Sequence, residues 1–262
     1  MEKFDIIIQG GQSNAEGYGL GEVTKEYIPS DKVLFLEVEK NVSIVEGKGV
    51  VIEYPKKSFI IELAKERKSG ENVLGDFSLT FARSYVKNGL LAEDRKLLII
   101  RSAIGGTGFQ RAHWGVKDPL FLKMMEMTEY ALSLNPENRV VGFLWHQGEH
   151  DAVERNTAEN YQKQLADMLS AVREKFGNLP FVAGDFVNEW KSEHLDICEP
   201  IVNAIKNVVK TSGNAAFVET SDLPSNNQKT GNGDPLHFSR EALHILGEKY
   251  FEKFQSLCCK AF

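Results

Sequence analysis

The sequence predicts an α/β fold in which helices cover both faces of a parallel sheet. Short, continuous apolar runs of the kind that form fully buried strands alternate along the chain with longer segments of helical periodicity. Glycines, prolines and asparagines separate these segments, as turns and helix ends require. A chain of 262 residues suits one large domain of this class, so we expect residues 1–262 to form a single domain.

Each element follows from its local pattern. Asp118 and Pro119 provide a cap and a first turn for one helix, and an Asn-Pro step ends it. The segment around 40–75 is the least regular part, and its residues 41–55 alternate about glycines, which predicts a hairpin. The expected buried strands are 4–9, 32–39, 95–106, 139–149, 179–185 and 214–220. The expected helices are 78–89, 118–136, 157–177, 200–210 and 239–257.

Composition excludes several classes of protein. The net charge of −6 argues against nucleic acid or an anionic membrane as the partner, because both favour a basic surface. Cys198, Cys258 and Cys259 are odd in number and lack metal-ligand spacing, so neither a disulfide framework nor a structural zinc site is expected. The start "MEKFDIII" lacks the pattern of a signal peptide, which predicts a cytoplasmic protein unless a leader was trimmed.

Polar stretches that follow apolar strands are where a site is expected, because open parallel sheets bind ligands at the carboxyl ends of their strands. The first is "GGQSN", which ends in Ser13 and Asn14. A serine at a helix start gains from the free N–H groups there, but by itself this pattern favours a helix cap. No lysine stands in this loop and the glycine spacing is wrong for a dinucleotide fold, so phosphate binding is disfavoured.

The late stretch "GDPLHFS" places Asp234 three residues before His237, across a turn that contains Pro235. This spacing lets a carboxylate hold one imidazole nitrogen while the other points away, as a general base requires. A surface turn explains the same residues, and Ser239 is expected to cap the last helix.

Two further stretches supply candidate donors and ligands. In "LWHQGEHDA", two histidines and two acids crowd a strand end, but Gly148 interrupts the helical face that a zinc motif needs. The amide of Gln147 could instead donate to an oxyanion, and the backbone N–H groups of Gly105 and Gly106 could approach a reacting group. An early serine, these donors and a late D-x-x-H together predict a serine esterase site without a metal.

The blocks "GQSN", "SAIGGT", "WHQGE-DA" and D-x-x-HFS resemble those of the SGNH hydrolase superfamily. They are most similar to its sialate O-acetylesterase and acetylxylan esterase branch, carbohydrate esterase family six. The resemblance implies a three-layer α/β/α, flavodoxin-like fold with a central parallel sheet of about five strands. It also implies removal of O-acetyl groups from a carbohydrate without a cofactor. The alternatives are a short-chain or lipid esterase of the same superfamily and a non-catalytic carbohydrate-binding relative.

The resemblance also implies residue roles. Ser13 is the nucleophile, His237 the general base and Asp234 its orienting acid. The oxyanion hole comprises the N–H groups of Ser13 and Gly106 and the side chain of Gln147. The supporting residues are Gln12, Asn14, Gly105 and Glu149, with Glu149 a second candidate for the acid role.

Two positions depart from the family pattern, since His150 replaces a small polar residue and Pro235 a glycine. We expect His150 at the mouth of the pocket, where it would affect substrate choice. Trp114, just past the glycine block, is the expected aromatic residue for stacking on a sugar. The expected partner is a small-molecule or oligosaccharide acetyl ester.

Overall fold

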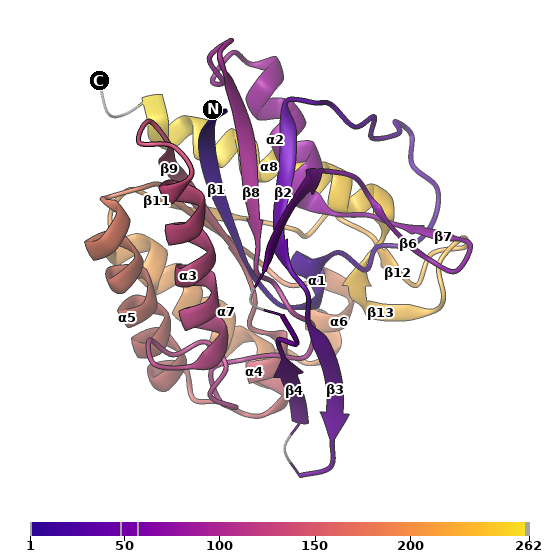
Figure 1. Ribbon diagram of the computed structural model, residues 1–262. Coiled ribbons are helices and arrows are strands. Elements are labelled where there is room, and N and C mark those ends of the chain that lie inside the picture. Colours follow the sequence, from indigo (N-terminus) through magenta and orange to yellow (C-terminus); the bar gives the residue numbers. More distant parts are fainter. Residues whose placement is uncertain (1, 48, 57, 260–262) are drawn as a thin grey trace.

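The computed structural model describes residues 2–47, 49–56 and 58–259 (Figure 1). Its centre is a sheet of seven strands, larger than the five or so that the resemblance implies. All neighbours in this sheet are parallel except the edge pair β2 and β5, which is antiparallel. In spatial order the strands are β11 (Ala215–Val218), β10 (Phe181–Gly184), β9 (Arg139–His146), β1 (Lys3–Gly11), β8 (Arg95–Arg101), β2 (Val33–Val38) and β5 (Phe59–Leu63).

Helices cover the two faces of this sheet and give a three-layer α/β/α arrangement (Figure 1). Helices α3 (Pro119–Ser133), α5 (Ala158–Phe176) and α7 (Leu195–Thr211) cover one face. Helices α2 (Phe77–Lys87) and α8 (Arg240–Cys258) cover the other. No helix in the described part of the chain is long and apolar enough to cross a membrane.

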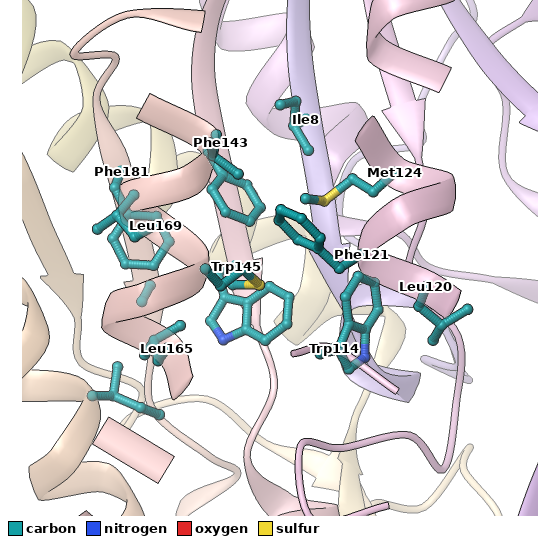
Figure 2. Packing of buried hydrophobic residues seen from close by; sticks show 14 of the residues in the cluster. Ile8, Trp114, Leu120, Phe121, Met124, Phe143, Trp145, Leu165, Leu169 and Phe181 are labelled. Atoms are coloured by element: carbon teal, nitrogen blue, oxygen red, sulfur yellow. The ribbon is translucent and has the colours of Figure 1, made fainter. Parts of the chain in front are cut away.

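The core splits at the sheet because successive strand residues point to opposite faces. Ile6 and Ile8 of β1 face one cluster, whereas Ile7 faces the other. Figure 2 shows the first cluster, in which Trp145 of β9 lies among aromatic and aliphatic side chains. Central β1 is buried along nearly its whole length, so the residues that follow it occupy a fixed position.

Most predicted elements are present with small changes at their ends. Helix α7 begins at Leu195 and contains Pro200, which the sequence predicts as its start. Buried Cys198, Ile201 and Ile205 pack one side of this helix against the core, and this packing maintains the turn that a proline disfavours.

The irregular segment forms two hairpins beside the sheet. One joins β3 (Asn41–Val45) to β4 (Gly49–Glu53), as the alternation predicts, and it extends beyond the body of the molecule (Figure 1). The other joins β6 (Arg67–Ser69) to β7 (Asn72–Leu74). Strand β5 lies between them in sequence and forms the antiparallel edge of the main sheet.

Candidate active site

A pocket of about 650 Å³ opens at the carboxyl ends of β1, β8 and β9, where the sequence places its polar stretches. Short helices α1 (Ser13–Glu16) and α4 (Glu149–Val153) begin there. The strand β13 (Asp234–Phe238), paired with β12 (Ser225–Asn226), contributes another side. The lining residues are Gln12, Ser13, Glu16, Tyr18, Val42, Ile44, Val50, Gly105, Gly106, Glu149, His150, Val153, Leu236 and His237.

Ser13 begins α1 directly after the central strand. A Cβ atom at Gly11, whose φ is +136°, would lie 2.1 Å from the carbonyl oxygen of His146, so only glycine permits this close approach. Gln12 fixes the same turn through its side-chain oxygen, which accepts the backbone N–H of His150 at 3.0 Å. The serine is therefore held between β1 and the loop that follows β9.

The serine, histidine and aspartate of the sequence motif form one chain of hydrogen bonds. Ser13 Oγ lies 2.8 Å from Nε2 of His237, and Nδ1 of His237 lies 2.5 Å from Oδ2 of Asp234. The carboxylate accepts the proton on Nδ1, which leaves Nε2 free to accept the hydroxyl proton of Ser13. The other carboxylate oxygen of Asp234 accepts the N–H of Leu236 at 2.8 Å, so Asp234 is itself oriented.

Asp234 and His237 lie on a short strand rather than on the expected turn. The register between β12 and β13 shifts between the pair Ser225–Phe238 and the pair Asn226–Asp234. This irregularity lets Asp234 and His237, three residues apart, lie on the same side of the strand. Glu149, the second candidate for the acid, lies outside this chain of hydrogen bonds because Asp234 occupies Nδ1.

Two backbone N–H groups beside Ser13 are available to a ligand. Among the described residues, neither Ser13 nor Gly106 has a hydrogen-bond partner for its N–H group. Gly106 has a φ of +69°, a conformation that favours glycine, and it lines the pocket. The N–H of Gly105 is already used, because it donates to Oε2 of Glu16 at 2.7 Å.

The structure corrects the expected donor role of Gln147. This residue is fully buried, and its amide nitrogen donates to Oδ2 of Asp151 at 2.7 Å and to oxygens of Gln12 and Thr107 at 3.2 Å. Its side-chain oxygen accepts the hydroxyl of Tyr161 at 3.0 Å. With all its bonds made to neighbouring loops, Gln147 holds the wall of the site and does not reach the pocket.

Asn14 and Glu149 form a buried pair behind Ser13. The amide nitrogen of Asn14 donates to Oε1 of Glu149 at 2.7 Å, while Oε2 of Glu149 is buried without a partner among the described residues. Burial raises the pKa of Glu149 because the ionised carboxylate loses its hydration. Next to it, burial lowers the pKa of His146 to about 3, so this imidazole is neutral near pH 7.

The two expected substrate contacts have different outcomes. Trp114 is fully buried, donates its indole N–H to Thr107 at 2.9 Å and packs edge-on against Trp145 (Figure 2). Contrary to expectation, Trp114 is a core residue and does not face a sugar. His150 does line the pocket, and burial lowers its pKa.

Sequence reasoning missed a polar group on the pocket floor. Glu16 accepts hydrogen bonds from Gly105 N and from Nη1 of Arg67, the latter at 3.3 Å. The ring of Tyr18 lies 5.7 Å from the imidazole of His237, and the guanidinium of Arg67 lies over the same tyrosine ring. Glu16 stands three residues after Ser13 in the same short helix, and this position was the signal available in the sequence.

No group of His, Cys, Asp and Glu side chains in the described ranges has the arrangement of a metal site. Asp151, from the stretch that suggested one, accepts the N–H groups of Phe109 and Gln110 at 2.9 and 2.8 Å. Its carboxylate therefore orders the loop that follows Gly106.

Two curated proteins resemble this chain in sequence. The probable carbohydrate esterase At4g34215 of Arabidopsis thaliana is 24% identical over 97% of this chain and 91% of its own length. The probable 9-O-acetyl-N-acetylneuraminic acid deacetylase of Escherichia coli (strain K12) is 28% identical over 44% of this chain and 37% of its own.

Solved structures share the fold. The crystal structure of NanS matches with a TM-score of 0.74 and 18% identity, covering 99% of this chain and 98% of that one. The Arabidopsis thaliana protein AT4G34215 matches with a TM-score of 0.68 and 18% identity, covering 98% and 99%. The profile of the family SASA, carbohydrate esterase, sialic acid-specific acetylesterase, matches residues 3–256. The chain therefore belongs to this carbohydrate esterase family.

Proposed function

We propose that the protein is a serine esterase that removes O-acetyl groups from a carbohydrate through a Ser13, His237 and Asp234 triad. The observation that carries the proposal is the distance of 2.8 Å between Ser13 Oγ and Nε2 of an imidazole whose other nitrogen contacts a carboxylate. A hydroxyl so placed can lose its proton to the imidazole as it attacks.

The reaction runs in two halves. Nε2 of His237 takes the proton of Ser13 Oγ while Oγ bonds to the acetyl carbonyl carbon, and the resulting imidazolium returns the proton to the departing sugar oxygen. Water then attacks the acetyl-serine, again giving a proton to His237, and the release of acetate restores the serine hydroxyl. Asp234 keeps the imidazole in the required tautomer and stabilises its cation.

The N–H groups of Ser13 and Gly106 are the donors for the oxyanion. Both border the pocket and have no partner among the described residues. One such donor contributes about 3–4 kcal/mol to transition-state stabilisation. The assignment leaves Gln147, whose amide is engaged elsewhere, as a residue that holds the loops in place.

Membership of the carbohydrate esterase family and the name of the Escherichia coli relative favour an acetylated sugar as the substrate. Tyr18 supplies a feature that suits a sugar, because its partly exposed ring borders the pocket beside His237. Aromatic faces of this kind bind the apolar faces of sugar rings, and Tyr18 takes the place that the sequence assigned to Trp114.

The test measures acetate release from a panel of O-acetylated sugars and from p-nitrophenyl acetate. We expect Ser13→Ala to lose activity and labelling by a fluorophosphonate, while Ser43→Ala, on the exposed hairpin, keeps both. A protein that binds acetylated sugars but is not labelled at Ser13 would be a non-catalytic relative. Faster hydrolysis of long acyl esters than of acetyl esters would identify a lipid esterase of the same superfamily instead.

A further inference from the structure

One wall of the pocket is an apolar face of the β3–β4 hairpin. Val42 and Ile44 line the pocket from β3, and Val50, opposite Ile44 in the register, lines it from β4. Ser43 and Val45 alternate with them and point to the other face. Ile44 is 86% exposed, so no residue in the described ranges covers this large apolar side chain at the mouth of the pocket.

The opposite side of the mouth is also apolar. Val153 of α4 is 55% exposed and Leu236 comes from β13, next to His237. An apolar group that enters between the hairpin and α4 would therefore contact hydrocarbon on both sides. Burial of such a group away from water is favourable in proportion to its area.

The hairpin is fixed to the glycine-rich loop of the site. Nδ1 of His113 accepts the N–H of Gly108 at 3.1 Å, which places the proton on Nε2, and Nε2 donates to the carbonyl oxygen of Val50 at 3.1 Å. These two hydrogen bonds of His113 fix the position of the β3–β4 hairpin relative to the loop that contains the proposed oxyanion donor Gly106. The apolar face is thus a fixed part of the pocket.

The charges in the pocket disfavour an anionic ligand. The ionisable acids among its described lining residues are Glu16 and Glu149, and that lining contains no lysine or arginine. Arg67 is close, but its guanidinium already donates to Oε1 and the carbonyl oxygen of Glu16 and to the carbonyl oxygen of Gly17. Among the described lining residues, a sugar carboxylate would therefore meet Glu16 and no lysine or arginine to pair with.

The size of the pocket indicates which part of an ester reaches the apolar rim formed by Val42, Ile44 and Val153. A volume of about 650 Å³ far exceeds an acetyl group, which the proposed reaction places beside Ser13. Ile44 and Val153 are largely exposed and lie at the mouth, so the alcohol side of the ester extends past them.

We propose that the natural substrate is a neutral acetylated sugar that carries an apolar group, such as an alkyl or aryl aglycone, and that Val42, Ile44 and Val153 bind this group. This inference rests on the proposed acetylesterase function. The proposed substrate is neutral, unlike the anionic sugar that the name of the family suggests, because this pocket has acidic lining residues and an apolar rim.

The test compares kcat/KM for acetate release from the octyl and methyl glycosides of one O-acetylated neutral sugar and from an O-acetylated sialic acid. We expect the octyl glycoside to be preferred at least tenfold over the methyl glycoside, and both over the sialic acid. Ile44→Thr should lower kcat/KM for the octyl glycoside at least threefold more than it lowers kcat/KM for the methyl glycoside. Val45→Thr, on the other face of the same strand, is the matched control and should change neither value.

Three results would overturn the inference: equal rates for the two glycosides, an unchanged octyl preference in Ile44→Thr, or a preference for the sialic acid. In each case, Ser13-dependent hydrolysis of p-nitrophenyl acetate would still support the proposed function. A p-nitrophenyl ester series of two to eight acyl carbons locates the apolar group. If Ile44→Thr affects the long acyl esters rather than the octyl glycoside, the group belongs to the acyl side and the inference is wrong. Loss of all Ser13-dependent hydrolysis would refute the proposed function itself.

Discussion

The side-chain oxygen of Asn14 accepts the backbone N–H of Phe238 at 3.0 Å, so the residue after the serine binds the residue after the histidine. The amide nitrogen of Asn14 also donates to the carbonyl oxygen of Leu236 at 3.2 Å. One side chain thereby holds both peptide groups that flank His237. Because α1 and β13 are far apart in sequence, this contact sets the distance between Ser13 and His237.

Replacing Asn14 with alanine should lower kcat for an acetyl ester by about 10- to 100-fold and leave KM nearly unchanged. The imidazole would lose its fixed position, and losing buried hydrogen bonds should reduce the free energy of unfolding by about 1–3 kcal/mol. Steady-state kinetics and denaturant unfolding measure both effects. Asn207→Ala, at an exposed asparagine of α7, is the control. A wild-type kcat in Asn14→Ala would show that the contact does not position His237.

Asp234→Asn should reduce kcat on the order of 10³- to 10⁴-fold while the protein stays folded. An amide in place of the carboxylate can present N–H to Nδ1 and favour the wrong tautomer, and it does not stabilise the imidazolium. Circular dichroism checks the fold, and acetate release measures the rate. The comparison is Asp222→Asn, an exposed carboxylate paired with Lys249. A loss below tenfold would indicate that another group orients His237.

Gly106→Ala should lower kcat by at least tenfold because the new methyl group displaces the N–H of this residue. A Cβ atom there would lie 2.9 Å from Cγ2 of Val50, and the φ of +69° adds strain of about 1–2 kcal/mol. Gly89→Ala is the matched control, since its φ is +73° and its Cβ would have no neighbour within 4 Å. Both substitutions should reduce the free energy of unfolding by a similar amount through backbone strain, but only Gly106→Ala should lose activity. Equal activities would remove Gly106 from the oxyanion hole.

Glu149 should make stability depend on pH. Its pKa is raised in the folded protein by burial, so folding favours the protonated carboxyl. Ionised Glu149 lowers the free energy of unfolding. This loss is absent below the pKa that Glu149 has in the unfolded chain, and it grows as pH rises from that pKa toward the pKa in the folded protein. Glu149→Gln keeps an acceptor for Asn14 and removes that loss, so its stability relative to wild type should increase between pH 4 and pH 8. Denaturant unfolding across this range checks the trend, and a constant difference contradicts it.

The sequence was sufficient for the parts of the fold that depend on local pattern. The apolar runs of β1, β8 and β9 and the Asp-Pro start of α3 predicted those elements. The beginning of α7 was not predictable locally, because burial of Cys198 outweighs the effect of Pro200. Strand β5 was missed although it is mostly apolar, because it lies in the irregular segment and pairs antiparallel at the edge of the sheet.

The motifs located the Ser13 and His237 contact but could not give the direction of each side chain. Gln147 and Trp114 are of the right residue types, yet their bonds to Asp151 and Thr107 point them into the protein. Such bonds depend on loops that meet only in the folded chain. The apolar face of β3 was visible as an alternation, but the α4 surface opposite it was not.

The separation of 224 positions between Ser13 and His237 has a consequence for biogenesis. The ribosome delivers the proposed nucleophile first, and the proposed base follows only after the intervening chain has been synthesised. On the proposed mechanism, a nascent or partly folded chain thus holds an inert serine, and hydrolysis starts only after β13 contacts α1. Turnover of a chromogenic ester can therefore time the formation of this contact during refolding in a stopped-flow experiment.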